Sequence, residues 1–140
     1  MVGEVTHVFL KPDHGDPMLS VPAATAVDGM GLREDASFGR SKRQVLVVEA
    51  EILERYDCRP GDFRENLTLR GIRLTELQAG DRLEIGEAIL EFQGACHPCG
   101  QMDKLKPGLQ AEIEGNRGIL AAVVRGGAIR PGDKVIIRAS

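Results

Sequence analysis

Turn signals divide this chain into short segments, and their spacing constrains the fold more than any other feature. Glycine followed by aspartate recurs in three similar phrases, at residues 59–62, 78–81 and 130–133. Glycine takes the positive φ angle that a tight turn needs, so each phrase predicts a turn, and the last two lead directly into alternating segments. The phrases are unevenly spaced, so they indicate shared turn chemistry and not an internal repeat.

The segments between these turns have the patterns of short strands. Residues 82–92 predict a hairpin in which Gly86 and Glu87 form a two-residue loop between two alternating strands. Pro22 places its own segment at a sheet edge or a bulge. Further strands or extended segments are predicted at residues 2–10, 18–27, 44–48, 63–69, 118–124 and 134–137.

Helices are few and short in this pattern. Apolar residues at helical spacing predict a helix over residues 49–56, and a shorter one is expected at 109–114. Residues 29–43 are expected to form a long polar loop, which in a compact domain is more often functional than accidental. Many short strands with few helices indicate a mostly β fold, arranged as a closed or partly open β-barrel.

The length and charge of the chain restrict its class. Its 140 residues suit one domain over residues 1–140, and its formal net charge is −3. That charge argues against general nucleic-acid binding, which requires a strongly basic face. Residues 1–10 lack the apolar core of a secretory signal, and no stretch approaches the roughly 20 apolar residues of a membrane span. We therefore expect a cytoplasmic monomer or dimer with reduced cysteines and no membrane partner.

Cys96, His97 and Cys99 bring candidate reactive groups into one short segment. A structural zinc site needs four ligands, commonly from two cysteine pairs, and this chain has one pair. A thioredoxin-like dithiol should open a helix, but the segment after Cys99 is soon broken by Pro107, which argues against a helix there. A free thiol can also be a small buried residue, which is the interpretation favoured for Cys58.

Four segments of the chain resemble, in order and spacing, the landmarks of MOSC domains. They are residues 43–50, 61–68, 79–86 and 97–99. MOSC domains occur at the C-terminus of molybdenum cofactor sulfurases, as free-standing small proteins, and in the mitochondrial amidoxime-reducing component. The resemblance extends over about residues 31–137. Residues 31–35 are similar to the Gly-Leu-x-Gly-Asp segment of the family, with Glu34 in place of the usual Gly and without the His expected shortly afterwards.

This resemblance implies a pyruvate-kinase-barrel-like fold that binds a molybdenum cofactor or carries sulfur for it. The single cysteine of the family pattern falls on Cys99, which becomes the implied catalytic residue and metal ligand. In amidoxime-reducing relatives this cysteine ligates molybdenum, and in the sulfurases it is proposed to hold a persulfide. A soft thiolate suits both partners. Cys96 lies outside the family pattern, and a small buried residue is favoured over a resolving thiol.

The pterin of this cofactor carries a phosphate, so the resemblance implies a basic pocket. Arg64 and Asn66 stand in a segment where amidoxime-reducing relatives have Phe-Arg-Pro-Asn, with the Arg on the cofactor, whereas many free-standing relatives have Gly at position 64. A guanidinium can grip phosphate through two parallel hydrogen bonds. Arg40, Lys42 and Arg43 form a second basic cluster, which either binds the cofactor or is a solvated loop face, and Arg117 is a further candidate for cofactor binding. Glu65 and Asp103 are interpreted as surface or turn carboxylates.

The resemblance implies two functions from different classes. An enzyme would reduce N-hydroxylated or N-oxide substrates through a molybdenum ligated by Cys99, with electrons from a separate reductase. A non-catalytic module would instead accept persulfide sulfur from a cysteine desulfurase. A third hypothesis is a barrel that has lost its ligand. No pyridoxal phosphate site of its own is expected, because that group belongs to a separate domain of full-length sulfurases. The first two functions require the Cys99 sulfur to open into a cleft that Arg64 also reaches.

Overall fold

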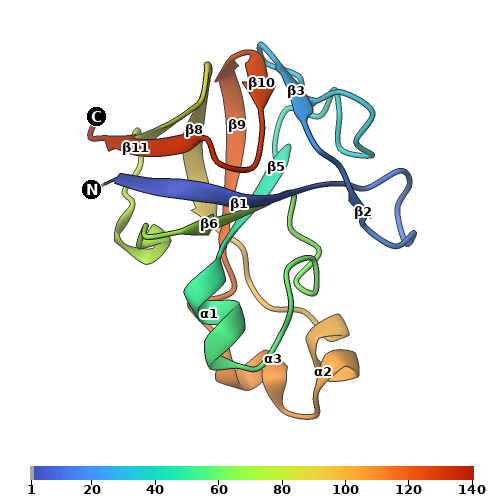
Figure 1. Cartoon of the computed structure of the whole chain (residues 1–140). Helices are drawn as coiled ribbons and strands as arrows, with labels where there is room; N and C mark the ends of the chain where they lie inside the picture. The colour runs from blue at the N-terminus through green and yellow to red at the C-terminus, as the bar shows by residue number, and fades with distance from the viewer. Residues whose placement is uncertain (1) are drawn as a thin grey trace.

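A β-sheet that closes on itself organises the chain (Figure 1). The computed structural model describes residues 2–140. Its larger sheet has 8 strands in the order β11-β7-β8-β9-β5-β6-β1-β2, and an additional pairing of β11 with β1 closes the ring and leaves β2 outside it. The ring strands are β1 (Val2–Leu10), β5 (Val45–Glu49), β6 (Leu67–Arg70), β7 (Arg82–Ile85), β8 (Ala88–Ala95), β9 (Ile119–Arg125) and β11 (Lys134–Arg138). The predicted mostly β barrel is confirmed.

The hairpin predicted over residues 82–92 is present, and its second strand is longer than expected. β7 and β8 pair antiparallel, with Ile85 opposite Ala88 across the two-residue loop. β8 continues to Ala95 and pairs antiparallel with β9 on its other side. Only β5 and β6 pair in parallel within the ring of residues 2–140 that the structure describes. The hairpin therefore leads directly into the segment that contains Cys96.

The strand predicted over residues 18–27 is divided in two at Pro22. β2 (Leu19–Ser20) pairs with β1, whereas β3 (Ala24–Val27) belongs to a 3-stranded sheet in the order β10-β3-β4. β4 (Gly31–Leu32) and β10 (Gly127–Ile129) complete that sheet, so part of the expected polar loop is an ordered strand. Proline lacks the N–H that a continuous strand ladder needs, which explains the break.

The three Gly-Asp phrases form the same turn, as predicted. In each phrase the N–H of the first residue donates to the Asp carboxylate, at 2.8 Å, 2.9 Å and 2.8 Å. The Asp N–H donates back to the carbonyl of that first residue. The three glycines, Gly61, Gly80 and Gly132, have φ angles of 91°, 89° and 94°. A positive φ at the third residue defines a type II turn, and glycine adopts it without steric cost.

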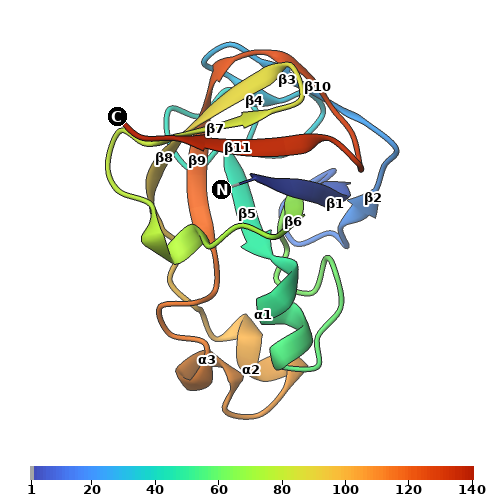
Figure 2. The ribbon, with the colours of Figure 1, turned by 60° about the vertical axis from the view of Figure 1, so that its left-hand side comes forward.

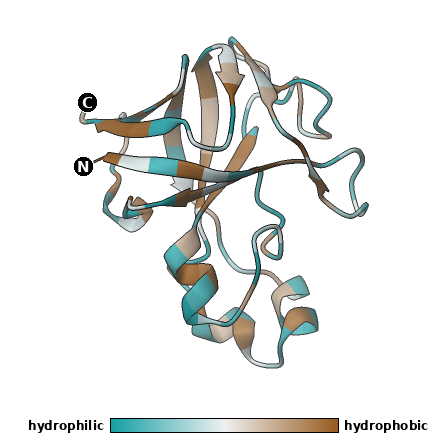
Figure 3. Ribbon diagram, in the orientation of Figure 1, coloured by the Kyte–Doolittle hydropathy of each residue, from teal (hydrophilic) through white to brown (hydrophobic). Residues whose placement is uncertain are grey.

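The barrel interior is filled by aliphatic side chains. β1 shows the alternation that produces this core, with one irregularity between Val5 and His7 that shifts it by one residue. Val5 and Val8 are therefore both buried, while Glu4 and His7 are exposed. The buried barrel cluster contains only Val, Leu, Ile and Ala residues, and Phe92 packs against it from a partly buried position. The hydropathy colouring in Figure 3 shows this alternation along the strands. Apolar burial of this kind is the main stabilising contribution to folding.

The short helices are α1 (Ala50–Arg55), the 3-10 helix η1 (Leu74–Glu76), α2 (Gln101–Leu105) and α3 (Leu109–Glu112). The helices α1, α2 and α3 gather beyond one end of the barrel, as Figure 1 and Figure 2 show. The expectation of no helix after Cys99 is wrong, because α2 begins two residues later. Met102 is 1% exposed and belongs to an apolar cluster with residues of α1 and α3. This burial stabilises a helix that is too short to persist alone.

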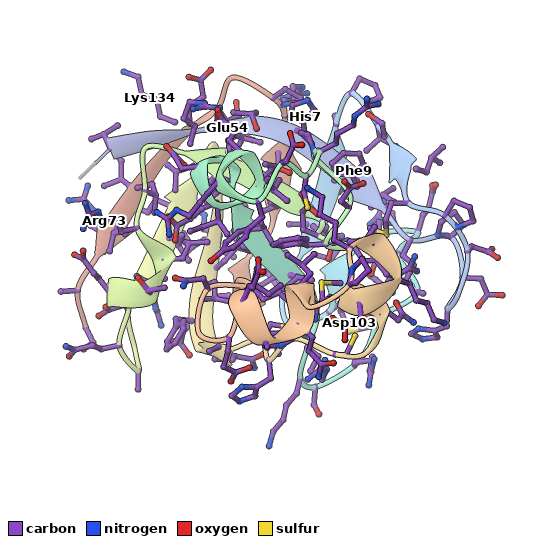
Figure 4. The ribbon with its side chains drawn as sticks, turned by 90° about the horizontal axis from the view of Figure 1, so that it is seen from below. His7, Phe9, Glu54, Arg73, Asp103 and Lys134 are labelled. Atoms are coloured by element: carbon purple, nitrogen blue, oxygen red, sulfur yellow. The ribbon has the colours of Figure 1, made fainter. Side chains whose placement is uncertain are left out.

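Hydrogen bonds join these helices to one another. Asp103 Oδ1 on α2 accepts the Gln110 N–H of α3 at 2.9 Å, and Lys106 Nζ donates to Tyr56 O beyond the end of α1 at 2.6 Å. Figure 4 shows the helices lying in front of the barrel when it is seen from below, with Asp103 on α2. Because these hydrogen bonds connect the helices, the cysteine segment is held between the barrel and a connected group of helices. Across residues 2–140, no helix has the length and apolar character needed to cross a membrane.

Candidate functional site

The cysteine segment is anchored at both of its ends. The Cys96 N–H donates to Gly118 O at 2.8 Å, which extends the pairing of strands β8 and β9 by one residue. The Met102 N–H donates to Cys99 O at 2.9 Å and turns the chain into α2. Between these anchors Cys96 is 4% exposed, whereas Cys99 is exposed at the surface. The two thiols thus have different access to solvent.

Both thiols line one cavity of about 370 Å³ that is rich in cations. Its charged side chains are Lys11, Arg40, Arg43, Arg64 and Arg117. Within residues 2–140, no Asp or Glu side chain lines this cavity. A concave site lined by charges of one sign concentrates ligands of the opposite sign. Cys99 and Arg64, which the sequence analysis expected at one cleft, both line this cavity.

Arg64 reaches the cavity from a turn that precedes β6. Its backbone has a φ of 60°, in the left-handed region, and its N–H donates to Gly61 O at 2.9 Å. The guanidinium Nη2 donates to Asp16 O at 2.9 Å, which leaves other N–H groups available for a ligand. A left-handed non-glycine residue costs on the order of 1–3 kcal/mol, and such strain tends to occur at functional sites.

Arg43 and Arg40 come from the loop before β5, and Lys42 of the same loop does not line the cavity. Arg43 is also left-handed, with a φ of 60°, and its N–H donates to Gln93 Oε1 at 3.3 Å. Gln44 was not singled out from the sequence, but it organises this loop. Its Nε2 donates to Arg40 O at 2.7 Å, and its Oε1 accepts the Val123 N–H of β9 at 2.9 Å. No pattern in the sequence distinguishes this glutamine from a surface residue.

Asn66 lines the cavity, but its side-chain amide is occupied by the protein itself. Its Nδ2 donates to Phe9 O at 3.2 Å and to Asp35 Oδ1 at 3.0 Å. Its Oδ1 accepts the Leu46 N–H at 3.0 Å. Both amide hydrogens of an asparagine are therefore used, so in this structure Asn66 holds β1, β5 and the loop of residues 31–43 together. A direct contact between Asn66 and a cofactor stays a prediction.

Lys11 is a cavity residue that the sequence analysis missed. It follows β1, and its backbone N–H donates to Asp35 Oδ1 at 2.8 Å. Burial lowers the pKa of the Lys11 ammonium, and the nearby Arg64 cation lowers it further, while Asp35 acts in the opposite direction. The repulsion between the Lys11 ammonium and the neighbouring Arg64 cation indicates that the positive charge of the cavity is not fully compensated. Pairing of β1 with β6 and the hydrogen bond to Asp35 bring Lys11 to the cavity that Cys99 lines, so no local signal could have identified it.

Arg117 connects the cysteine segment to the segment that contains Arg64. It is 7% exposed, and its Nη1 donates to Cys96 Sγ at 3.0 Å and to His97 O at 3.3 Å. Its Nη2 donates to Phe63 O at 2.9 Å. The buried Nε has no hydrogen-bond partner in the structure, although the side chain lines the cavity. A buried guanidinium with a free donor is suited to receive an anion.

The interpretation of Glu65 as a surface or turn carboxylate is wrong about its exposure, because its side chain is 0% exposed. Its Oε2 accepts the Gly61 N–H at 2.9 Å and the Thr68 hydroxyl at 2.7 Å, so it braces the turn that presents Arg64. Burial raises the pKa of the Glu65 carboxyl, although these hydrogen bonds act in the opposite direction. Nothing in the local sequence pattern distinguishes this buried position from an exposed one.

Three alternative sites fit the structure less well. Within residues 2–140, no group of three or more His, Cys, Asp or Glu side chains is placed to hold a metal ion. The strand before Cys96 pairs antiparallel on both sides, so the cysteine pair does not stand in the βαβ unit of a thioredoxin-like site. A larger cavity of about 610 Å³ lies beside α1, but its lining includes Glu49 and Glu51 and no cysteine.

Comparisons with known proteins show that the fold is shared with solved structures. Among solved structures, the chain is similar to the YUAD protein of Bacillus subtilis, with a TM-score of 0.86, 20% identity and coverage of 100% of this chain and 97% of that one. It is also similar to YiiM of Geobacillus stearothermophilus, with a TM-score of 0.74, 18% identity and coverage of 97% and 75%. YiiM of Escherichia coli gives a TM-score of 0.72, 16% identity and coverage of 98% and 70%.

These identities establish the shared fold alone, and comparison with curated proteins gives no significant match. The MOSC domain family model matches residues 35–136, which include β5 to β9 in full, β11 as far as Ile136 and both thiols of the cavity, but not β1. The chain therefore belongs to the MOSC domain family.

Proposed function

We propose that this MOSC domain binds a molybdenum cofactor in the cation-lined cavity and that Cys99 supplies the working sulfur there. The observation that carries the proposal is the position of an exposed thiol in the same cavity as five cationic side chains, while no carboxylate from the described residues 2–140 is in the lining. Anionic groups are favoured in such a cavity, and a thiolate is a ligand that soft metals prefer.

The residues present fit such a group in size and in chemistry. A volume of about 370 Å³ falls within the range of roughly 300–1,000 Å³ that is usual for small-molecule sites. The unpartnered Nε of Arg117 and the free N–H groups of Arg64 could receive a phosphate. Cys99 Sγ could take the position of a metal ligand. When bound, the cofactor supplies the redox chemistry, and the protein supplies binding and orientation.

Each cavity residue would then have a definite role. Arg64 and Arg117 would hold the anionic end of the cofactor, with Arg43, Arg40 and Lys11 adding positive charge around it. Asn66 would act through the loops that it connects. As an enzyme, the domain would reduce N-hydroxylated substrates and would receive electrons from a separate reductase.

A second function, that of a non-catalytic sulfur carrier, is favoured by the exposure of Cys99. A thiol at the rim of a cavity is accessible to a partner such as a cysteine desulfurase, and its persulfide would be surrounded by cations that stabilise an anionic sulfur. Mass spectrometry distinguishes the two functions. A stable gain of about 32 Da on Cys99 supports the carrier, and retained metal without that gain supports the cofactor site.

The proposal is tested with protein purified from a host that makes the cofactor. Metal analysis and pterin fluorescence should detect both components in the wild-type protein, and both should fall in the Cys99→Ala and Arg64→Ala variants. Lys42→Ala is the matched control, because it removes a cation from the same surface without changing the cavity lining. Absence of metal and pterin from the wild-type protein, together with no persulfide on Cys99, would overturn both functions.

A further inference from the structure

The second thiol of the cavity does not have the surroundings of a structural cysteine. Cys96 is buried, but it lines the same cavity as Cys99 and is not packed only against apolar side chains. Arg117 Nη1 lies 3.0 Å from Cys96 Sγ. Cys58 packs against an apolar cluster and donates to Tyr56 O at 3.5 Å. Cys96 Sγ also donates to a backbone carbonyl, His97 O, at 3.9 Å, so the guanidinium beside Cys96 is what distinguishes the two thiols. The earlier interpretation of Cys96 as only a small buried residue does not explain its cationic partner.

The environment of Cys96 is suited to a negatively charged sulfur. A guanidinium is a partner that thiolates prefer, and it donates a charge-assisted hydrogen bond to them. Arg117 is itself held in place, because it also donates to Phe63 O and His97 O. Its Nε is buried and has no hydrogen-bond partner among residues 2–140. A sulfur chain on Cys96 would therefore find a rigid cation beside it.

We propose that Cys96 is a second sulfur-carrying residue, which takes a sulfane sulfur from a persulfide on Cys99. This inference rests on the proposed sulfur-carrier function. The Cys96 thiolate attacks the terminal sulfur of the Cys99 persulfide, a new S–S bond forms on Cys96, and the S–S bond on Cys99 breaks. Cys99 leaves as a thiolate and the persulfide proton moves with the terminal sulfur, so no external oxidant or reductant is needed.

The transfer would move sulfur from an accessible position to a protected one. Cys99 is exposed and can meet a donor, whereas Cys96 is 4% exposed and faces the cations of the cavity. Attack at the inner sulfur of the Cys99 persulfide would instead give a Cys96–Cys99 disulfide and release hydrosulfide. That reaction makes Cys96 a resolving thiol, and the two reactions give products of different mass.

The experiment treats the reduced protein briefly with glutathione persulfide and then caps the thiols at successive times. Fragment masses between Cys96 and Cys99 locate the added mass of about 32 Da. In the wild-type protein the label should appear first on Cys99 and then on Cys96. In Cys96→Ser it should stay on Cys99, and in Cys99→Ser Cys96 should stay unlabelled over the same times. Thermal melting of each variant verifies that it is folded.

Arg117→Lys tests the cation, and Lys42→Ala is its control outside the cavity. The lysine variant should slow transfer to Cys96 by about tenfold, because it loses the fixed donor to the sulfur, and the control should not change the rate. Label that stays on Cys99 in the wild-type protein overturns the transfer while the carrier function stands. Equally fast labelling of Cys96 in Cys99→Ser, or formation of a disulfide with sulfide release, also overturns it. No label on Cys99 overturns the carrier function and the transfer together.

Discussion

Asn66 Nδ2 donates to Asp35 Oδ1 at 3.0 Å, and this hydrogen bond joins two segments that are separated by 31 residues in the sequence. The same carboxylate accepts the N–H groups of Lys11 at 2.8 Å and Ser37 at 3.0 Å. Asp35 is 6% exposed and does not line the cavity, yet three of its partners do. The arrangement of the cavity therefore depends on a buried carboxylate behind its wall.

This arrangement predicts that Asp35→Asn is strongly destabilising. An amide offers one acceptor oxygen where the carboxylate offers two, so at least one buried donor loses its partner. We expect the free energy of unfolding to fall by about 2–3 kcal/mol, measured by urea denaturation. Asp103→Asn is the control, because that exposed carboxylate accepts one backbone N–H and should cost about 1 kcal/mol or less. Equal losses in the two variants would contradict the role given to Asp35.

The left-handed backbone of Arg64 has a steric cost that can be measured separately from the role of its guanidinium. Arg64→Gly and Arg64→Ala both remove the guanidinium, but only glycine adopts a φ of 60° without steric cost. The glycine variant should be more stable than the alanine variant by about 1 kcal/mol in urea denaturation. Both variants should bind inorganic phosphate more weakly than the wild-type protein in calorimetric titration. Unchanged phosphate binding would show that the guanidinium does not serve the cavity.

Local patterns account for the elements that the sequence predicted well. The hairpin of β7 and β8 depends on alternation and a two-residue loop, and the three Gly-Asp turns depend on residues within four positions. Closure of the barrel could not be predicted in this way, because it depends on pairing between the first and last strands. The helix α2 was missed for a related reason, since burial of Met102 among distant residues stabilises it.

The residues of the site fall into the same two groups, those that a sequence segment identifies and those that only the fold brings to the cavity. Cys99 and Arg64 were recognisable because they stand in segments that resemble family landmarks. Lys11 carries no such signal and reaches the cavity because β1 pairs with β6 and the Lys11 N–H donates to Asp35. Lys42 stands next to Arg43 in the sequence, but it is exposed and lies outside the cavity lining. Sequence reasoning thus found a basic loop and could not determine which of its side chains turn toward Cys99.

Glu65 gives a prediction about pH. Burial raises its pKa above the ordinary value of 4.5, so the folded protein holds this proton more tightly than the unfolded chain does. The contribution of Glu65 to stability is then fully present below pH 4.5 and is lost as the pH rises through the raised pKa. The amide side chain in the Glu65→Gln variant does not ionise. The stability of the wild-type protein relative to this variant should therefore fall with rising pH, measured by urea denaturation at several pH values. A constant difference would contradict the shift.

Two of the three thiols, Cys99 and Cys58, predict an order of alkylation that also reports on the cavity. Cys99 is exposed and should react first with iodoacetamide at neutral pH, followed over time by mass spectrometry. Cys58 is half-buried, and burial together with the nearby Asp62 carboxylate raises the pKa of its thiol, so less reactive thiolate is present and it should react more slowly. Inorganic phosphate should slow the reaction of Cys99 by occupying the cation-lined cavity, while Cys58, which does not line it, provides the internal control. If phosphate slowed both thiols equally, or neither, the anion would not be bound beside Cys99, because only a ligand in that cavity shields one thiol and leaves the other unchanged.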